Sequence, residues 1–169
     1  MTAEDFKRQI LPFKDKLYRF SFRILDNIAE AEDVVQEVMI KIWNDRANLG
    51  RINNLEAWCM RLTKNLSIDK KRSKNFQLKA IPDNYDIAQT SAGPQKLAEL
   101  GDAMESIGKL IKQLPESQQM TIQLRDIEGL SYKEIAEILE MDINRVKVNI
   151  HRARTFIRNK LIKAESYGL

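Results

Sequence analysis

Near the carboxyl end of the chain lies a run of side chains suited to binding a nucleic acid. Between Arg145 and Lys163 the sequence has seven Lys or Arg residues and no Asp or Glu. At a helical step of about 100° per residue, one side of this segment is apolar and consists of Val146, Ile150, Ala153, Ile157 and Leu161. The opposite side carries Val148, His151, Arg152, Thr155 and Asn159, with Lys147 and Arg158 beside it. A helix with a buried apolar stripe and a basic back can enter the DNA major groove and contact phosphates and base edges.

The elements that precede this helix favour the same interpretation. Ser131 and Glu134 have the S-x-x-E spacing of a capping box, which begins one short helix, and Asp142 can cap the next. Residues 127–161 are therefore predicted to form two helices joined by a tight turn. The alternative is a basic helix whose charges are only solvated, and it does not require the capped helix and turn.

Catalytic chemistry has few candidates in this sequence. Cys59 is the only cysteine and His151 the only histidine, which excludes an internal disulfide and a His- or Cys-rich metal site. Glu32 and Asp33 are adjacent rather than facing, and Tyr132 is better explained as a surface residue of the first motif helix. We expect no catalytic residue, no metal and no cofactor.

The composition predicts an all-α protein of the cytoplasm. Of 169 residues, 43% are hydrophobic and 31% are charged, and strand-like alternation is scarce. The amino-terminal residues lack the basic start and apolar run of a signal peptide. Because no apolar segment approaches the ~18 residues of a membrane span, we expect no membrane insertion.

Charge is arranged in blocks along a chain whose net charge is only +4. Residues 26–37 contain five acids and no base, and residues 61–79 contain seven bases and one acid. Residues 83–105 contain five acids and one base, before the basic carboxyl-terminal run. These blocks indicate more than one partner: nucleic acid for the basic segments and a protein surface for the acidic ones.

The first 43 residues predict three helices. Apolar residues three and four apart fill residues 4–25, and Pro12 divides them into a short helix ending near Leu11 and a second that starts at the proline. A regular helix is predicted for residues 29–43, with a polar side formed by Asp33, Gln36, Glu37 and Ile40. A solvated acidic face is the simpler interpretation, but an exposed Ile40 among acids suits a docking surface for a partner helix.

Residues 44–54 are rich in Asn, Gly and charge and are predicted to form a loop. A helix follows from Leu55 to Lys74, and its carboxyl half gathers five bases: Lys64, Lys70, Lys71, Arg72 and Lys74. Bases complement the dipole at a helix carboxyl end, but five exceed what capping requires. Together with neighbouring Asn residues they suit a nucleic-acid backbone.

Residues 76–95 lose periodicity and are predicted to form a flexible linker. The chain is therefore divided into two small helical domains, residues 1–75 and 96–169. In the second, apolar residues from Leu97 to Leu114 predict one helix, and another opens at Glu116 and is ended by Gly129 at a C′ position.

Segments on both sides of the linker resemble one family. Residues 31–43 (AEDVVQEVMIKIW) and 57–72 (AWCMRLTKNLSIDKKR) are similar to region 2 of bacterial RNA polymerase sigma factors. Residues 114–158 (LPESQQMTIQLRDIEGLSYKEIAEILEMDINRVKVNIHRARTFIR) are similar to region 4. The missing middle domain and the length resemble the extracytoplasmic-function (ECF) group. The resemblance implies a non-catalytic subunit that binds core RNA polymerase, recognises a bipartite promoter and promotes its opening, with an anti-sigma factor as a further partner.

The resemblance also implies roles for individual residues. Docking on the coiled coil of the largest polymerase subunit is expected of Asp33, Gln36, Glu37 and Ile40. The loop 44–54 is expected to capture a flipped base of the minus-ten element, at a cost of a few kcal/mol for unstacking. Minus-ten contacts are expected of Asn53, Asn54, Lys64, Asn65, Lys70, Lys71 and Arg72. Minus-thirty-five contacts are expected of Ser131, Tyr132, Arg145, Lys147, Val148, His151, Arg152 and Thr155.

Three residues depart from the family pattern in the second domain. Glu140 stands where the turn usually has Gly, so a less favoured backbone is expected there. Val148 replaces a small polar residue and Asn149 replaces an Arg. Val148 can meet a thymine methyl and Arg152 can pair with guanine, so these departures bear on which promoter sequence is preferred.

Two other classes of protein are alternatives for this sequence. A conventional helix-turn-helix regulator would bind duplex DNA on its own, and response regulators share such a carboxyl-terminal unit. Their amino-terminal half needs alternating strands and helices, which this sequence does not predict. A DNA-cleaving or recombining enzyme would need clustered carboxylates or a nucleophile near His and Arg.

Overall fold

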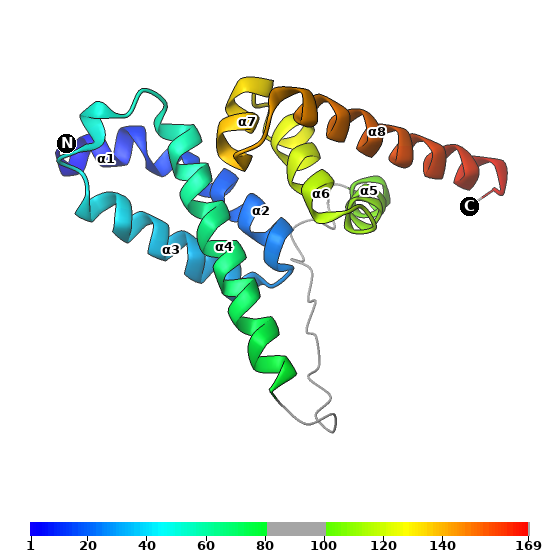
Figure 1. Cartoon of the computed structure of the whole chain (residues 1–169), viewed down its shortest axis with the longest axis horizontal. Coiled ribbons are helices and arrows are strands. Elements are labelled where there is room, and N and C mark those ends of the chain that lie inside the picture. Colours follow the sequence, from blue (N-terminus) through cyan, green and yellow to red (C-terminus); the bar gives the residue numbers. More distant parts are fainter. Residues whose placement is uncertain (81–100, 169) are drawn as a thin grey trace. The chain divides into compact units, whose positions relative to one another are not determined.

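The computed structural model describes residues 1–80 and 101–168, and within those ranges the regular elements are all helical (Figure 1). Contacts divide the chain into two compact units, Met1–Ala92 and Gly93–Leu169. The all-α fold predicted from the sequence is confirmed. Residues 81–95 of the predicted linker, and Leu97 and Leu100 of the helix predicted after it, lie outside the described residues.

The first unit is a helical bundle built on α2 (Lys14–Leu25), α3 (Ile28–Asn44) and α4 (Leu55–Lys79). Each of these helices contacts the other two. The short helix α1 (Ala3–Gln9) and the 3₁₀ turns η1 (Leu11–Phe13) and η2 (Leu49–Arg51) complete the unit. The core is made of fully or nearly fully buried apolar side chains: Leu17, Phe20, Ile24, Val34, Val38, Ile42, Cys59 and Met60.

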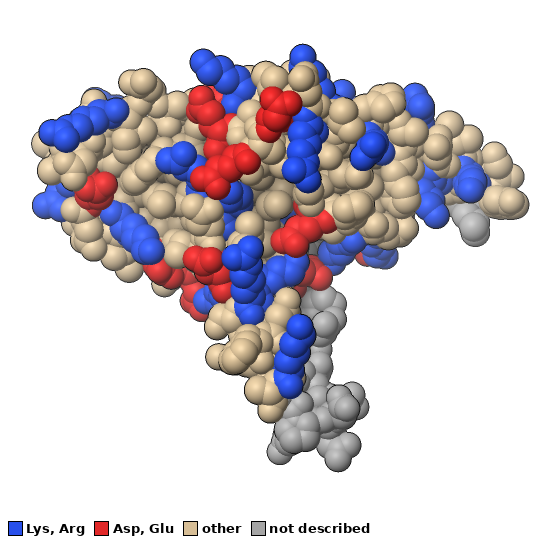
Figure 2. Space-filling model, viewed as in Figure 1, with Lys and Arg blue, Asp and Glu red and all other residues tan. Residues whose placement is uncertain are grey.

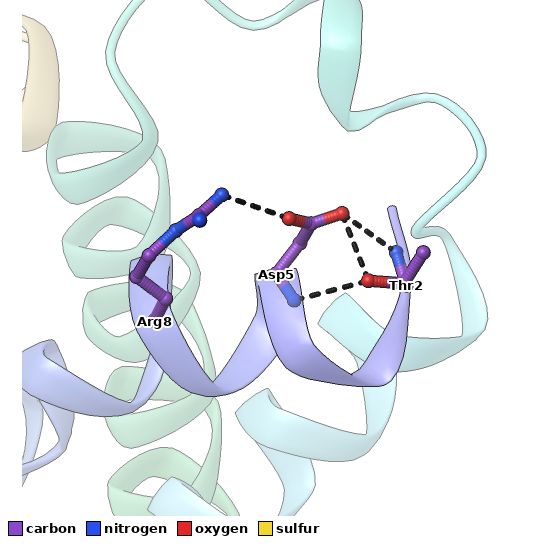
Figure 3. Close-up of polar contacts among 3 residues, drawn as sticks. All are labelled: Thr2, Asp5 and Arg8. Carbon is purple, nitrogen blue, oxygen red and sulfur yellow. Dashed lines mark hydrogen bonds and ion pairs between the residues drawn. The ribbon is translucent and has the colours of Figure 1, made fainter.

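Helix α1 begins with a reciprocal capping box (Figure 3). The Asp5 amide donates to Thr2 Oγ1 and the Thr2 amide donates to Asp5 Oδ2, each at 3.1 Å. Arg8 Nη2 donates to Asp5 Oδ1 at 2.9 Å. The Asp5 carboxylate accepts from the Thr2 amide and also from Thr2 Oγ1 at 2.9 Å, and these two hydrogen bonds hold the pKa of Asp5 below its ordinary value. The capped helix places Phe6 edge-on against Trp43, with ring centroids 5.4 Å apart.

Helix boundaries in this unit follow the expected breaks, with one shift at Pro12. The sequence predicted a helix starting at the proline, whereas residues 11–13 form a 3₁₀ turn and α2 begins at Lys14. Asp26 takes a left-handed backbone conformation (φ 51°) and ends α2. Asn27 then caps α3 by accepting a hydrogen bond from the Glu30 amide at 2.9 Å.

Helix α4 continues five residues beyond the predicted end at Lys74, through Lys79. The predicted linker therefore starts too early by four residues, 76–79. The sequence there (FQLK) contains neither Gly nor Pro, so nothing interrupts the helix. The apolar periodicity did not predict this end of the helix. Residues 75–80 are all exposed, and an exposed helix end has no apolar stripe.

The second unit contains α5 (Asp102–Lys112), α6 (Glu116–Ile122), the π-helical turn η4 (Gln123–Ile127), α7 (Tyr132–Leu139) and α8 (Ile143–Ser166). Helix α8 contacts α5, α6 and α7. One buried cluster joins Ile111, Leu114, Ile122 and Ala153. Gly129 has φ 75°, so the predicted C′ position is confirmed. Among the helices of the described residues, none has the length and apolar character needed to cross a membrane.

Candidate nucleic-acid interface

The helix-turn-helix consists of α7, a tight turn and α8, as the capping signals predicted. Ser131 and Glu134 form the capping box: the Ser131 amide donates to Glu134 Oε2 at 2.8 Å and the Glu134 amide donates to Ser131 Oγ at 3.2 Å. Asp142 caps α8 by accepting from the Asn144 amide at 3.3 Å. Ser131 is therefore exposed at the start of α7 but uses its hydroxyl to hold that helix end.

Glu140 takes the left-handed conformation that the turn between the helices requires, with φ 53° and ψ 48°. A residue with a Cβ is strained there by roughly 1–2 kcal/mol, which is why Gly is favoured at such a position. The less favoured backbone expected at Glu140 is confirmed. The turn is closed by two hydrogen bonds, because the amides of Glu140 and Met141 both donate to the carbonyl of Ala136.

Helix α8 presents the two faces that the periodicity predicted. Val146, Ile150 and Ala153 are buried, and Ile157 is half-buried. The predicted apolar stripe ends there, because Leu161 is exposed. On the other side, the exposed residues of the expected minus-thirty-five set are Arg145, Lys147, Val148, His151 and Arg152, and Thr155 is half-buried. The structure thus brings these side chains together on one surface of α8.

Asn149 points into the unit and does not belong to that surface. Only 6% of it is exposed. Its Nδ2 donates to Ser117 Oγ at 2.9 Å and approaches Met141 Sδ at 3.8 Å. Asn149 therefore belongs to the packing between α8 and α6 and not to the exposed surface. Its bearing on promoter preference stays a prediction.

Tyr132 lies between cations from two other elements. Its ring is 4.5 Å from the guanidinium carbon of Arg125 and 6.0 Å from Nζ of Lys147. Arg125 Nη1 also donates to the carbonyl of Leu130 at 2.8 Å. Two of the expected minus-thirty-five residues, Tyr132 and Lys147, are thereby held beside each other.

The π-helical turn η4 supplies two residues that periodicity did not identify. Arg125 contacts Tyr132, and Asp126 accepts a hydrogen bond from Arg154 Nε at 3.0 Å. This pairing with Asp126 raises the pKa of Arg154 above its ordinary value. The turn arises because the Glu128 amide donates to the carbonyl of Gln123, five residues earlier, at 3.0 Å. A single extra residue in a helical turn leaves no signal in the apolar pattern.

In the first unit, the acidic face of α3 is exposed as expected. Asp33, Gln36 and Glu37 are exposed, and Ile40 is 59% exposed. Some of this charge is matched within the unit: Glu37 lies 3.5 Å from Lys41 Nζ and Asp33 lies 3.5 Å from Lys70 Nζ. The face therefore combines partly balanced acids with an apolar side chain in water.

The bases of α4 divide between two sides of the helix. Arg72 and Asn65 are exposed, whereas Lys70 and Lys71 are half-buried. Lys70 turns toward Asp33 of α3, and in the same way Lys74 lies 3.3 Å from Glu30. Figure 2 shows Lys and Arg side chains along the end of α4 and along α8. Of the expected minus-ten residues on α4, Arg72 and Asn65 share the surface turned away from α3.

Two expected minus-ten residues have other positions. Lys64 is buried, with 6% exposed, because its place on the helix falls on the side that packs in the bundle. It is not part of an exposed DNA surface in this structure. Asn54 caps α4 by accepting a hydrogen bond from the Ala57 amide at 2.9 Å, whereas Asn53 is exposed. Local capping is sufficient to explain Asn54.

Comparison with known proteins decides the family. Residues 10–77 match the family described as Sigma-70 region 2, and residues 104–157 match Sigma-70, region 4. The chain is 33% identical over 165 residues to the ECF RNA polymerase sigma factor SigW of Bacillus subtilis, covering 88% of this chain and 84% of that protein. The chain belongs to the ECF sigma factors.

Other ECF sigma factors are similar over nearly the whole chain. SigE of Mycolicibacterium smegmatis is 30% identical over 154 residues, which cover 90% of this chain and 60% of that relative. This chain thus spans less than two thirds of the length of SigE.

Two solved structures share the fold. The sigma factor RpoE, solved with the anti-sigma factor NepR from Bartonella quintana, superposes with a TM-score of 0.80 at 25% identity, over 94% of this chain and 98% of that one. CnrH, solved with the cytosolic domain of CnrY, superposes with a TM-score of 0.70 at 18% identity, over 96% and 90%. In the described part of this ECF chain, no group of three or more His, Cys, Asp or Glu side chains is placed to hold a metal ion.

Proposed function

We propose that the chain is a promoter-specificity subunit of bacterial RNA polymerase. It binds the core enzyme, directs it to a bipartite promoter and promotes opening of the DNA, while the chemistry of RNA synthesis belongs to the core. The observation that carries the proposal is the match to region 2 and region 4 in one chain, and the exposed basic side chains of α4 and α8 support it. It acts in the cytoplasm, where it meets the polymerase.

The core enzyme docks on α3. Asp33, Gln36 and Glu37 supply hydrogen-bonding and acidic groups, and Ile40 supplies apolar area that becomes buried in the complex. Polar groups around an apolar centre are the usual composition of a transient protein interface. The partner surface is the coiled coil of the largest subunit.

Promoter DNA is held at two places. Region 4 inserts α8 into the major groove of the minus-thirty-five element, where Lys147 and Arg145 meet phosphates and Arg152, His151 and Val148 meet base edges. Region 2 holds the minus-ten element with the 44–54 loop and the exposed surface of α4. A protein partner of the anti-sigma class regulates the chain, as NepR accompanies RpoE in the similar structure.

The test is a reconstitution with purified core RNA polymerase. We expect transcripts that start at discrete promoters only when the chain is added. The Asp33→Ala/Gln36→Ala/Glu37→Ala variant should retain its circular dichroism spectrum and lose affinity for core. Intact core binding by that triple variant would contradict the docking assignment.

A conventional helix-turn-helix regulator is the competing function. Its helix-turn-helix would resemble α7 and α8, but a match to region 2 over residues 10–77 is not expected of it. No feature of the described residues favours it over a sigma factor.

A further inference from the structure

We propose that Phe76, near the carboxyl end of α4, is a stacking site for an unpaired nucleobase of the opened promoter. Phe76 is 77% exposed, and α4 carries it past the predicted end of the helix. The proposal rests on the proposed function, because that function brings opened DNA to α4. Single apolar residues are common on protein surfaces. The exposure of Phe76 therefore indicates a binding site only if the side chains around the ring also suit a nucleic acid.

Those neighbours are the DNA-directed residues of α4. With a step of about 100° per residue, Phe76 falls within about 60° of several exposed polar side chains, among them Asn65, Asp69, Arg72, Ser73 and Lys79. Arg72 and Lys79 are four residues before and three residues after the ring, which are the spacings of direct neighbours on a helix. Asp69 is the acidic residue on this side. A basic side chain thus flanks the ring on each side along the helix, Arg72 before it and Lys79 after it.

Two other basic residues of this helix end turn the other way. Lys70 and Lys74 face α3, where they lie 3.5 Å from Asp33 and 3.3 Å from Glu30. The outer surface therefore combines one flat aromatic side chain with the acid Asp69 and two cations, Arg72 and Lys79, that do not take part in those two pairs. Proteins bind single-stranded nucleic acid with this combination: the cations contact phosphates, and the aromatic ring stacks on a nucleobase.

A helical protein partner fits this surface less well. Docking of an amphipathic helix needs several apolar anchors on one side. The other exposed apolar residue of this helix end, Leu78, is 39% exposed and points about 160° away from Phe76. A single aromatic ring between cations is enough to bind a nucleobase, because one ring is enough to stack on the π-face of one base.

Opening of the promoter supplies the ligand. A base that flips into the 44–54 loop leaves its neighbour without a stacking partner. Asn65 and Phe76 are eleven residues apart, which is about three helical turns and roughly 16 Å. One strand can therefore contact Asn65 and place another base, a few nucleotides away, on Phe76.

The experiment measures the affinity of the complex with core polymerase for a fork-junction promoter that has a single-stranded overhang. Four variants are compared: Phe76→Ala, Phe76→Tyr, Phe76→Leu and, as the matched control, Leu78→Ala. Phe76→Ala is expected to weaken binding about fivefold or more. Phe76→Tyr keeps a flat ring and should stay within about twofold, whereas Phe76→Leu should resemble Phe76→Ala. Leu78→Ala should stay within about twofold.

Two further readouts separate stacking from other roles. Affinity for core polymerase and for a duplex promoter kept closed at low temperature should not change in Phe76→Ala. Loss of core affinity would overturn the proposal in favour of a protein contact. Full affinity in Phe76→Leu would overturn it in favour of a non-stacking apolar contact.

Binding by the unmodified chain separates failure of the proposed function from failure of the stacking site. If its complex with core does not bind the fork-junction DNA, the proposed function fails and stacking fails with it. If that complex binds and Phe76→Ala binds equally well, only the stacking site is overturned.

Discussion

Asn149 Nδ2 donates a hydrogen bond to Ser117 Oγ across 2.9 Å and thereby joins α8 to α6. The bond spans 32 residues of sequence and is made by a carboxamide that is 6% exposed. Asn149 is directed inward toward α6, whereas the adjacent Val148 is 44% exposed on the surface proposed to contact DNA. A buried polar group of this kind is costly to leave unpaired.

Replacing Asn149 by Ala is therefore expected to lower the free energy of unfolding by roughly 1–3 kcal/mol. Urea denaturation followed by circular dichroism measures the change. Asn159→Ala is the control, since Asn159 is exposed on the same helix and should change stability by about 0.5 kcal/mol or less. Equal effects of the two substitutions would show that the bond to Ser117 does not stabilise the unit.

Glu140→Gly should stabilise the second unit. The left-handed backbone at φ 53° strains a side chain with a Cβ, and relief of the strain offsets the extra backbone entropy of Gly, leaving a gain of about 0.5–1 kcal/mol. Glu137→Gly, in the regular part of α7, should instead lose about 1 kcal/mol. The account of the turn is wrong if the thermal midpoint falls in Glu140→Gly.

Cys59 should be inert in the folded protein. Burial, with a smaller contribution from Glu56, raises the pKa of its thiol to about 12 from an ordinary value of 9.0. An aromatic disulfide reagent at pH 8 is expected to react with Cys59 only after unfolding in urea. Rapid reaction of the native chain would show that the thiol is accessible.

The same raised pKa predicts how stability depends on pH. The folded state keeps the Cys59 proton between pH 9 and about 12, whereas the unfolded state releases it. Stabilisation by the buried thiol is thus complete below about pH 9 and is lost as pH rises toward 12, by up to about 1.4 kcal/mol per pH unit. The stability difference between the unmodified chain and Cys59→Ala should shrink from pH 8 to pH 10.5. A difference that is constant with pH contradicts the assignment.

Arg72 and Lys70 should differ as DNA contacts although they are two residues apart. Arg72 is exposed on the outer side of α4, whereas Lys70 lies 3.5 Å from Asp33. For the complex with core on promoter DNA, Arg72→Ala should reduce the slope of log affinity against log salt by about 1. Lys70→Ala should change that slope less, and an equal reduction would show that Lys70 leaves Asp33 to meet a phosphate.

Features set by neighbours in the chain were predicted well from the sequence. The capping box of Ser131 and Glu134 and the buried stripe through Val146 and Ile150 depend on spacings of three and four residues. Such spacings are visible in the letters alone. The face of α3 proposed to dock on core polymerase and the surface of α8 proposed to contact DNA are exposed as expected.

Features set by distant contacts were not predicted. In the sequence Lys64 groups with Lys70 and Arg72 because all three are basic, and only the packing of α4 shows that Lys64 is buried. The contact between Arg125 and Tyr132 depends on a π-helical turn that has no compositional signal. The end of α4 was missed because exposed residues carry no apolar pattern.

The central claim is that DNA recognition by this chain depends on core RNA polymerase. The most direct measurement is fluorescence anisotropy of a labelled promoter titrated with the chain alone, with core alone and with both. The account predicts weak, sequence-independent binding by the chain alone and by core alone, and tight promoter-specific binding only when both are present. Equally tight, sequence-specific binding of the duplex by the chain alone would contradict it and identify a conventional regulator.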